Sequence, residues 1–249
     1  MVPIKIPQLV GHRGWPARYP ENTLEGFAAA VGAGARWLEC DVQMSADGVP
    51  FVCHDLSLKR TTGIDRDITE IPAAELISVT VGEGPRLGER YADIKLVPFT
   101  ALIAWLETQP QVTLFVEIKR QSLRHFGGDN VVRSVLAAGQ AALKQCVIIS
   151  FDHACLSLAR KQGAPAIGWA TEESTPQIHH LVHTLDPDYL FTSDERFADV
   201  HNALNGPWQW VVYQTQDPQR ALQLAAQGAG LVETNDIGAM LKSPEFASS

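Results

Sequence analysis

Three acidic side chains stand where they could bind a divalent cation. Glu39 and Asp41 are two residues apart in the run ECDVQM, so a β-strand there would direct both carboxylates to one face. Glu117 closes another apolar run, TLFVE. Three carboxylates with no cysteine ligand suit a hard ion such as Mg²⁺ or Ca²⁺, and without an ion they would raise one another's pKa. The sequence therefore predicts one divalent-cation site on Glu39, Asp41 and Glu117.

Two basic residues and two histidines accompany these acids. His12 and Arg13 follow the apolar run Gln8–Gly11, Lys119 comes two residues after Glu117, and His54 follows the run 49–53. Two fixed positive charges beside a cation suit an oxyanion such as phosphate, so Arg13 and Lys119 are predicted to bind it. A pair of imidazoles can accept and donate a proton near neutral pH, which predicts His12 and His54 as the catalytic pair.

Each piece also has an ordinary structural explanation. A single Glu-x-Asp on a strand is most often solvated or salt-bridged, and Arg13 and Lys119 could simply neutralise acids inside a polar core. The joint occurrence of all seven residues at predicted strand ends favours a site. Other features are interpreted as structural, namely the histidines His179, His180 and His183 on a solvent-facing helix and Trp208 and Trp210 in the core. Trp15 is a second possibility, an aromatic ring that could cover a choline head group.

The segment 39–55 is predicted to form the β-hairpin that presents the acids. Ala46-Asp47-Gly48 has turn chemistry, because Asp bonds its own backbone and Gly accepts a positive φ. The return strand is expected over 49–53. Folding about this turn places Gln43 opposite Pro50, Asp41 opposite Val52 and Glu39 opposite His54, so that an acidic pair and a histidine converge.

The rest of the chain alternates between short apolar runs and helical patterns. A helix is expected from Leu24 with its N-cap at Asn22 or Thr23, and further helices over 99–107, 130–143, 154–162, 176–183, 195–204 and 218–226. Strands are expected over 8–11, 37–42, 112–118, 146–150, 166–170, 189–192, 209–213 and 230–233. About eight parallel strands predict an α/β fold of the TIM-type (β/α)8 barrel class. The first turn, GHRGW, is no G-x-G-x-x-G, which argues against a dinucleotide-binding open sheet.

The chain is expected to be one barrel domain over residues 1–249. The hairpin is an excursion at the C-terminal rim, and residues 56–97 form a small cap insertion there, with apolar residues too few and scattered for a core of its own. The 249 residues carry a net charge of −8, which argues against a nucleic-acid surface. The start of the chain, MVPIKIPQLVGHRG, shows no signal-peptide core, and no run approaches the roughly 18 apolar residues of a membrane span.

The cysteines bear on the cellular location of the protein. Four cysteines lie in apolar runs without CxxC spacing, namely Cys40, Cys53, Cys146 and Cys155. Buried reduced thiols are typical of a cytoplasmic protein, which is the predicted location. Nothing in the pattern predicts an oligomeric state. The expected partner is a small-molecule phosphoester.

Several motifs in this order and spacing resemble the glycerophosphodiester phosphodiesterases over essentially the whole chain. They are His12-Arg13-Gly14, Pro20-Glu21-Asn22-Thr23, Glu39-Cys40-Asp41-Val42, Asp47-Gly48 with His54-Asp55, Arg60-Thr61-Thr62 and Glu117-Ile118-Lys119. The resemblance implies a TIM-type barrel and hydrolysis of glycerophosphodiesters, such as glycerophosphocholine or glycerophosphoethanolamine, to glycerol 3-phosphate and an alcohol. It implies Glu39, Asp41 and Glu117 as ligands of one divalent cation, Mg²⁺ or Ca²⁺, His12 and His54 as the acid/base pair, and Arg13 and Lys119 as the phosphate-binding residues.

The resemblance is weaker in the C-terminal part. Where the family usually shows an aromatic residue followed by T-V-N, the chain has Tyr213-Gln214-Thr215-Gln216, and where Thr-Asp is usual on the last strand it has Thr234-Asn235. Two alternatives differ in substrate or in activity. A lysophospholipase D-like enzyme would need an apolar groove, and the polar cap counts against it. A non-catalytic phosphate-ester binding protein would lack a histidine or an acid, and none is missing.

Overall fold

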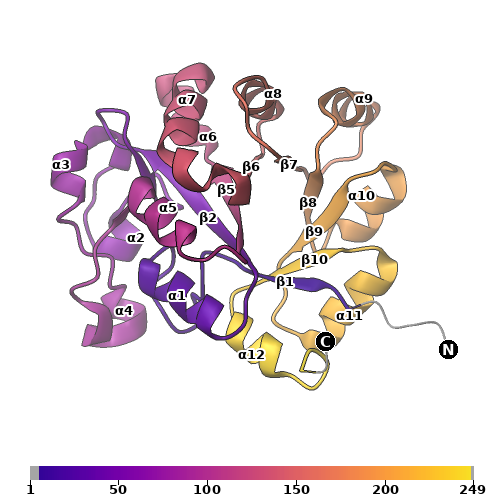
Figure 1. Ribbon diagram of the computed structural model, residues 1–249, viewed down its shortest axis with the longest axis horizontal. Coiled ribbons are helices and arrows are strands. Elements are labelled where there is room, and N and C mark those ends of the chain that lie inside the picture. The colour runs from indigo at the N-terminus through magenta and orange to yellow at the C-terminus, as the bar shows by residue number, and fades with distance from the viewer. Residues whose placement is uncertain (1–5, 248–249) are drawn as a thin grey trace.

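The computed structural model describes residues 6–247, and eight parallel strands in it close into a ring (Figure 1). The expectation of no signal peptide concerns the start of the chain, and residues 1–5 lie outside the described part. The ring closes because β1 pairs with both β10 and β2. Its strands are β1 (Gln8–Gly11), β2 (Trp37–Met44), β5 (Thr113–Ile118), β6 (Cys146–Ser150), β7 (Ile167–Ala170), β8 (Tyr189–Ser193), β9 (Gln209–Tyr213) and β10 (Leu231–Thr234). The predicted (β/α)8 barrel is confirmed.

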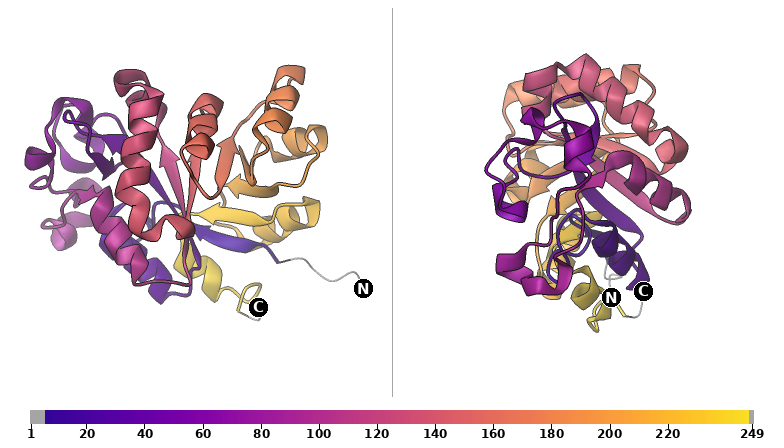
Figure 2. Two further views of the ribbon diagram at one scale, coloured as in Figure 1. Left: turned by 45° about the horizontal axis from the view of Figure 1, so that its top comes forward. Right: turned by 90° about the vertical axis from the view of Figure 1, so that its left-hand side faces the viewer.

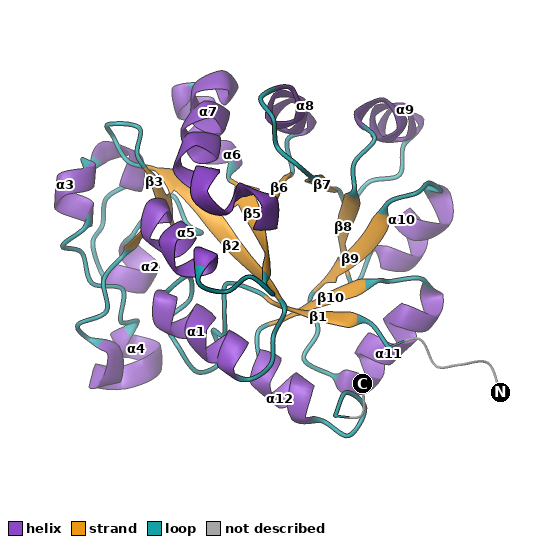
Figure 3. Ribbon diagram, viewed as in Figure 1, coloured by secondary structure: helices purple, strands orange, loops and turns teal. Residues whose placement is uncertain are grey.

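Helices surround the ring of strands, as Figure 3 shows in purple around orange. They are α1 (Leu24–Gly32), α5 (Phe99–Glu107), α6 (Arg120–Phe126), α7 (Gly128–Gly139), α8 (His153–Lys161), α9 (Pro176–Leu185), α10 (Phe197–Ala203), α11 (Pro218–Gln227) and α12 (Ile237–Lys242). The α1 helix begins as expected, because the Thr23 side chain accepts the Gly26 N–H. The sequence analysis missed α6, a short helix between Lys119 and α7. No helix among residues 6–247 is long and apolar enough to cross a membrane.

The interior of the barrel has an apolar floor below the carboxyl ends of the strands. Alternate residues of each strand point inward and pack together, with the Phe115 and Phe191 rings 5.0 Å apart edge to face. Gly168 provides the space for this packing, since a Cβ there would lie 2.7 Å from the Phe191 ring. A larger apolar shell, which includes Trp208 and Trp210 as predicted, fills the space between strands and helices. Polar chemistry is therefore confined to the rim above the floor.

The hairpin exists, but its predicted register is wrong by one residue. Met44 pairs with Pro50, Gln43 with Phe51 and Val42 with Val52, so the return strand β3 is Pro50–Val52. The difference arises at the turn, because the Ser45 N–H donates to the Val49 carbonyl and three residues, 46–48, form the loop. The Ser45 side chain also accepts the Val49 N–H and donates to Asp47. His54 therefore lies beyond the end of β3 and is not paired with Glu39.

The cap has a small core of its own, which contradicts the expectation that its apolar residues are scattered. Leu58, Ile68, Ile71 and Leu76 are buried with one face of β3 in a separate apolar cluster. The cap contains α2 (Lys59–Thr62), α3 (Ala73–Leu76) and α4 (Gly84–Leu87), and β4 (Val97–Pro98) returns the chain to the barrel beside β3. Figure 2 shows these purple segments gathered at one side of the ring. The β3 strand organises the cluster, because it offers one apolar face to the cap.

Candidate active site

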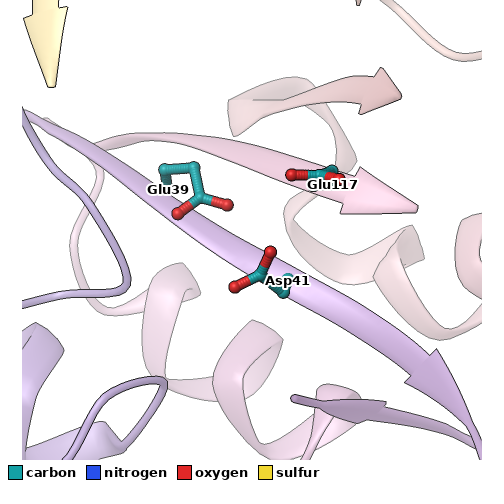
Figure 4. Close-up of side chains that lie close together, drawn as sticks. All are labelled: Glu39, Asp41 and Glu117. Carbon is teal, nitrogen blue, oxygen red and sulfur yellow. The ribbon is translucent and has the colours of Figure 1, made fainter. Parts of the chain in front are cut away.

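The three predicted cation ligands converge at the carboxyl ends of two adjacent strands. Glu39 and Asp41 point inward from β2, while Cys40 and Val42 point into the apolar shell, as the two-residue period requires. Asp41 and Glu117 are direct neighbours in the parallel register of β2 and β5. One oxygen of each carboxylate lies within 4.8 Å of the others, and Figure 4 shows the three groups turned toward a common space.

The donor set fits a hard divalent cation. All three ligands are carboxylates, and Glu39 and Asp41 are buried. The Oε1 atom of Glu39 has no hydrogen-bond partner within residues 6–247. Burial and the neighbouring Asp41 raise the pKa of Glu39 well above its ordinary value, and burial and Asp41 raise that of Glu117 as well. A cation between the three carboxylates would reduce their mutual repulsion and would provide a partner for Glu39 Oε1.

Asp41 stays ionised because two basic side chains flank it. Lys119 Nζ lies 3.2 Å from Asp41 Oδ1 and 2.8 Å from Glu117 Oε1, and Arg13 Nε lies 3.2 Å from Asp41 Oδ2. Burial alone would raise the pKa of Asp41, but Lys119 and Arg13 outweigh burial and lower it. The same contacts raise the pKa of the Lys119 ammonium against the effect of its own burial. The two predicted phosphate-binding cations are thus fixed beside the acids.

The loop after β1 positions Arg13 through its backbone. Arg13 and Asn22 both adopt left-handed conformations, with φ of 52° and 58°. In this geometry the Arg13 N–H donates to Glu39 Oε2 at 3.0 Å, and the Asn22 N–H donates to the Arg13 carbonyl at 3.0 Å. Asn22 Nδ2 also donates to Asp41 Oδ2 at 2.9 Å. Two strained residues therefore connect the loop to two of the carboxylates.

His12 has a fixed orientation and tautomer. Its Nδ1 donates to Asn235 Oδ1 at 2.8 Å, which leaves the lone pair on Nε2, the atom 3.8 Å from Glu39 Oε2. Burial and the nearby Arg13 lower the pKa of His12 to about 4. The neutral amide of Asn235, at the position where the family usually has Asp, orients the ring without adding a negative charge.

His54 is held by a carboxylate. Its Nδ1 lies 2.6 Å from Asp55 Oδ1, and Arg60 Nε donates to Asp55 Oδ2 at 2.6 Å. Arg60 also forms two hydrogen bonds with Glu21, at 2.7 and 2.8 Å, and Glu21 in turn pairs with Arg13. The Asp55 carboxylate thus orients the His54 ring, whereas an amide orients the ring of His12. Arg60 connects the loop of His54 to the loop of Arg13.

Two cavities at the site share His12, Arg13 and Gln214 among their lining residues. The inner one, about 210 Å³, includes His12, His54, Glu117 and Lys119 among its lining residues and has Ile149, Ala170, Phe191 and Tyr213 on its apolar side. The outer one, about 710 Å³, continues from His12 and Arg13 toward the cap and is lined by Arg60, Glu83, Arg86 and the amides of Gln214, Gln216 and Asn235. All seven predicted site residues therefore lie together, with both histidines on one cavity.

Several residues that line or contact the site were not predicted from the sequence. Glu21, Asn22 and Asn235 were not predicted as site residues, although each contacts one. Arg60 was noted only as part of a motif, and it contacts Glu21 and Asp55. Glu233 was noted only as a strand end, yet it is 3% exposed and lines the inner cavity. The sequence feature that could have identified Glu233 was its charge at the end of a predicted barrel strand.

Trp15 does not cover the cavities, so the choline-stacking possibility is wrong. The residue is buried, its Nε1 donates to Asp236 at 2.7 Å, and its ring fills the space that a Cβ at Gly238 would need. It packs against α12. Within residues 6–247, the carboxylate trio is also the one group of three or more side chains arranged to hold a metal, and the histidines of α9 do not form another.

Comparisons with known proteins agree with this geometry. The sequence model of the Glycerophosphoryl diester phosphodiesterase family matches residues 12–233. The chain is 27% identical over 206 residues to uncharacterised protein YqiK of Bacillus subtilis, covering 80% of this chain and 77% of that protein. It is 30% identical over 157 residues to a glycerophosphodiester phosphodiesterase of Bacillus altitudinis, covering 62% of each.

The chain also resembles a solved structure over nearly its whole length and several longer proteins over a small part of theirs. An Oleispira antarctica phosphodiesterase, solved in complex with the product sn-glycerol-3-phosphate, superposes with a TM-score of 0.83 at 24% identity, covering 98% of both chains. The chain spans only 9% to 18% of several animal proteins described as containing a glycerophosphodiester phosphodiesterase domain.

Proposed function

Since the family model matches residues 12–233, this chain belongs to the glycerophosphoryl diester phosphodiesterase family, and from this premise we propose that it hydrolyses glycerophosphodiesters to glycerol 3-phosphate and an alcohol. The observation that carries the proposal is the convergence of two carboxylates, two basic side chains and two histidines on one cavity, with the third carboxylate, Asp41, within 4.8 Å of the other two. The product named for the Oleispira antarctica enzyme also supports it.

The two histidines are suited to opposite proton transfers. His12 exposes the Nε2 lone pair toward the cavity side of Glu39, so it accepts the proton of the attacking oxygen, whether from water or from the substrate's own hydroxyl. His54, paired with Asp55, donates a proton to the leaving alcohol as the P–O bond breaks. Arg13 and Lys119 stabilise the charge that develops on the phosphoryl oxygens.

Glu39, Asp41 and Glu117 would hold one divalent cation, Mg²⁺ or Ca²⁺. Bound there, the ion would supply Lewis-acid polarisation of a phosphoryl oxygen and neutralise the carboxylates. Lys119 and Arg13 keep Asp41 ionised and ready to bind. A cytoplasmic location is consistent with four free, buried cysteines.

The outer cavity favours a small polar head group over a lipid. Its walls are arginine, glutamate and amide side chains, with Pro16, Ala17 and Pro85 as the apolar contributions. The apolar cluster of the cap contributes no residue to the lining of this outer cavity. The glycerophosphodiester reaction is thus preferred to the lysophospholipase D-like alternative, and the complete set of acids and histidines favours an enzyme over a binding protein.

The test measures release of glycerol 3-phosphate from glycerophosphoethanolamine. We expect turnover that EDTA abolishes and that Mg²⁺ or Ca²⁺ restores. His12→Ala and His54→Ala should each lower turnover by about 10²–10⁴-fold. His180→Ala, an exposed position of α9, is the matched control and should leave turnover unchanged. Wild-type turnover by either alanine variant would refute the histidine assignment, and no release with either metal would refute the function.

A further inference from the structure

Glu233 is a buried carboxylate that the reaction described above does not use. It points inward from β10, beside Val10 of β1, and is 3% exposed. Its side chain lines the inner cavity together with the catalytic histidines. Its Oε1 atom is fully buried and has no hydrogen-bond partner within residues 6–247. A buried carboxyl group with an unpaired oxygen is unfavourable, so a hydrogen bond to this group is expected when the cavity is filled.

The other charged groups of the site do not provide that partner. Lys119 pairs with Asp41 and Glu117, and Arg13 pairs with Asp41 and Glu21. Glu233 is also outside the group of carboxylates whose oxygens lie within 4.8 Å of one another. Glu233 is therefore a lining residue of the cavity that is not one of the three proposed cation ligands.

The apolar part of the inner cavity offers no side-chain hydrogen-bonding group to a polar ligand. Part of the cavity's lining is formed by Ile149, Ala170 and Phe191, none of which has a side-chain hydrogen-bonding group. A glycerol moiety held there would bring free hydroxyl groups, each of which needs an acceptor once water is displaced. Glu233 is a side-chain acceptor on this cavity that carries an unpaired oxygen.

We propose that Glu233 accepts a hydrogen bond from a hydroxyl of the substrate's glycerol moiety and thereby selects glycerophosphodiesters over phosphodiesters that lack such hydroxyls. This inference rests on the proposed function. It makes the inner cavity the glycerol subsite and leaves the outer cavity, lined by Gln214 and Gln216, for the departing alcohol.

The experiment compares two substrates and two variants. Glu233→Leu removes the acceptor, and we expect kcat/KM for glycerophosphoethanolamine to fall by about 10- to 100-fold, the effect of leaving a buried hydroxyl group without its partner. For bis(4-nitrophenyl) phosphate, which has no glycerol, kcat/KM should change less than about 2-fold, since the cation site and histidines are intact. Glu233→Gln keeps the shape and an acceptor oxygen, so its loss should be smaller than that of the leucine variant.

Calorimetric titration of the metal-free protein with Mg²⁺ gives a readout independent of turnover. We expect equal affinity in wild type and Glu233→Gln. Weaker Mg²⁺ binding, or equal losses on both substrates, would overturn the inference and make Glu233 part of the cation site. If wild type hydrolyses glycerophosphoethanolamine and both variants keep its preference, only this inference fails. If wild type does not hydrolyse it, the proposed function fails first.

Discussion

Asp41 is the residue on which the charged groups of the site converge. It contacts Lys119 and Arg13, and accepts a hydrogen bond from Asn22, while lying in register beside Glu117. The types and spacing of the acids, bases and histidines were enough to predict seven residues that lie close together in the structure. The partners that orient them were not predictable in the same way, because Asn22 and Asn235 act through backbone turns and a ring contact that no local pattern specifies.

Lys119 is expected to stabilise the metal-free protein. Lys119→Met leaves Asp41 and Glu117 buried without their shared cation, so the free energy of unfolding in EDTA should fall by about 3–5 kcal/mol. Mg²⁺ or Ca²⁺ should recover part of the loss, because either ion binds the folded state. Urea denaturation with and without metal measures both effects.

The matched control is Lys59→Met. Lys59 forms an exposed ion pair with Asp65, so its loss should cost no more than about 1 kcal/mol. Equal destabilisation by the two variants, or no response of Lys119→Met to metal, would contradict the expectation.

Glu233 should make the stability of the metal-free protein depend on pH. Burial, followed by the charges of Glu117 and Asp41, raises its pKa to about 8 from the ordinary 4.5. Between these values the folded state holds a proton that the unfolded chain has released, so this group's contribution to stability falls as pH rises. Glu233→Gln removes the effect. In EDTA it should stabilise the protein at pH 8 relative to wild type, and by much less near pH 5.

Urea denaturation at the two pH values tests this. Glu195→Gln, at an exposed position after β8, serves as control and should change stability equally at both. A Glu233→Gln gain that is the same at pH 5 and pH 8 would show that the carboxyl group does not titrate in this window.

At the scale of elements, regular strands and helices were predictable and the connections were not. The strands β6 and β9 and the helix α5 have the predicted bounds, because period-2 and helical apolar patterns are local. The hairpin register depended on whether Ser45 pairs with Val49 or with Gly48, a choice fixed by its side chain. The cap core was missed because its residues gather on β3 from short turns without periodicity.

The cap cluster should contribute measurably to stability. Ile71 is 1% exposed within it, whereas Ile77 on the next turn is 53% exposed. Ile71→Ala should lower the free energy of unfolding by about 2–5 kcal/mol, and Ile77→Ala by no more than about 0.5 kcal/mol. Hydrogen exchange should rise in residues 56–97 of Ile71→Ala before it rises in the barrel strands. Equal effects of the two substitutions would mean that the cluster is not a packed core.

At the scale of the whole molecule, ring closure brings residues from the two ends of the chain into contact. His12 of the first loop and Asn235 after the last strand are 223 positions apart, yet they share a hydrogen bond. The count of about eight strands predicted closure. It could not predict the packing inside the ring, where a glycine on one strand faces an aromatic ring on the next.

Gly168 tests that packing. In Gly168→Ala the new Cβ would lie 2.7 Å from Phe191 and 2.9 Å from Ile149, so stability should fall by about 1–3 kcal/mol. Gly168→Ala combined with Phe191→Leu should lose less than the sum of the single variants, because the two sites are in contact. Thermal and urea denaturation of the wild type, the two single variants and the double variant measure this coupling.

Gly32→Ala is the control, since a Cβ there meets no atom within 4 Å. Its stability should be unchanged or raised by up to about 1 kcal/mol. Strict additivity in the Gly168 and Phe191 cycle would contradict the packing argument.

The way the cap is attached links the outer cavity to the loop that carries Arg13. Arg86 of α4 pairs with Glu83 and donates to the carbonyls of Pro16 and Tyr19, so one short segment both closes the outer cavity and docks on the first loop. The predicted cation ligands and histidines make no contact with Arg86 in these bonds, but Glu83 accepts the Glu21 N–H, and Glu21 pairs with Arg13. A lineage that exchanged residues 83–86 for a segment of different shape, and so accepted a new leaving alcohol, would therefore also need a new partner for Glu21.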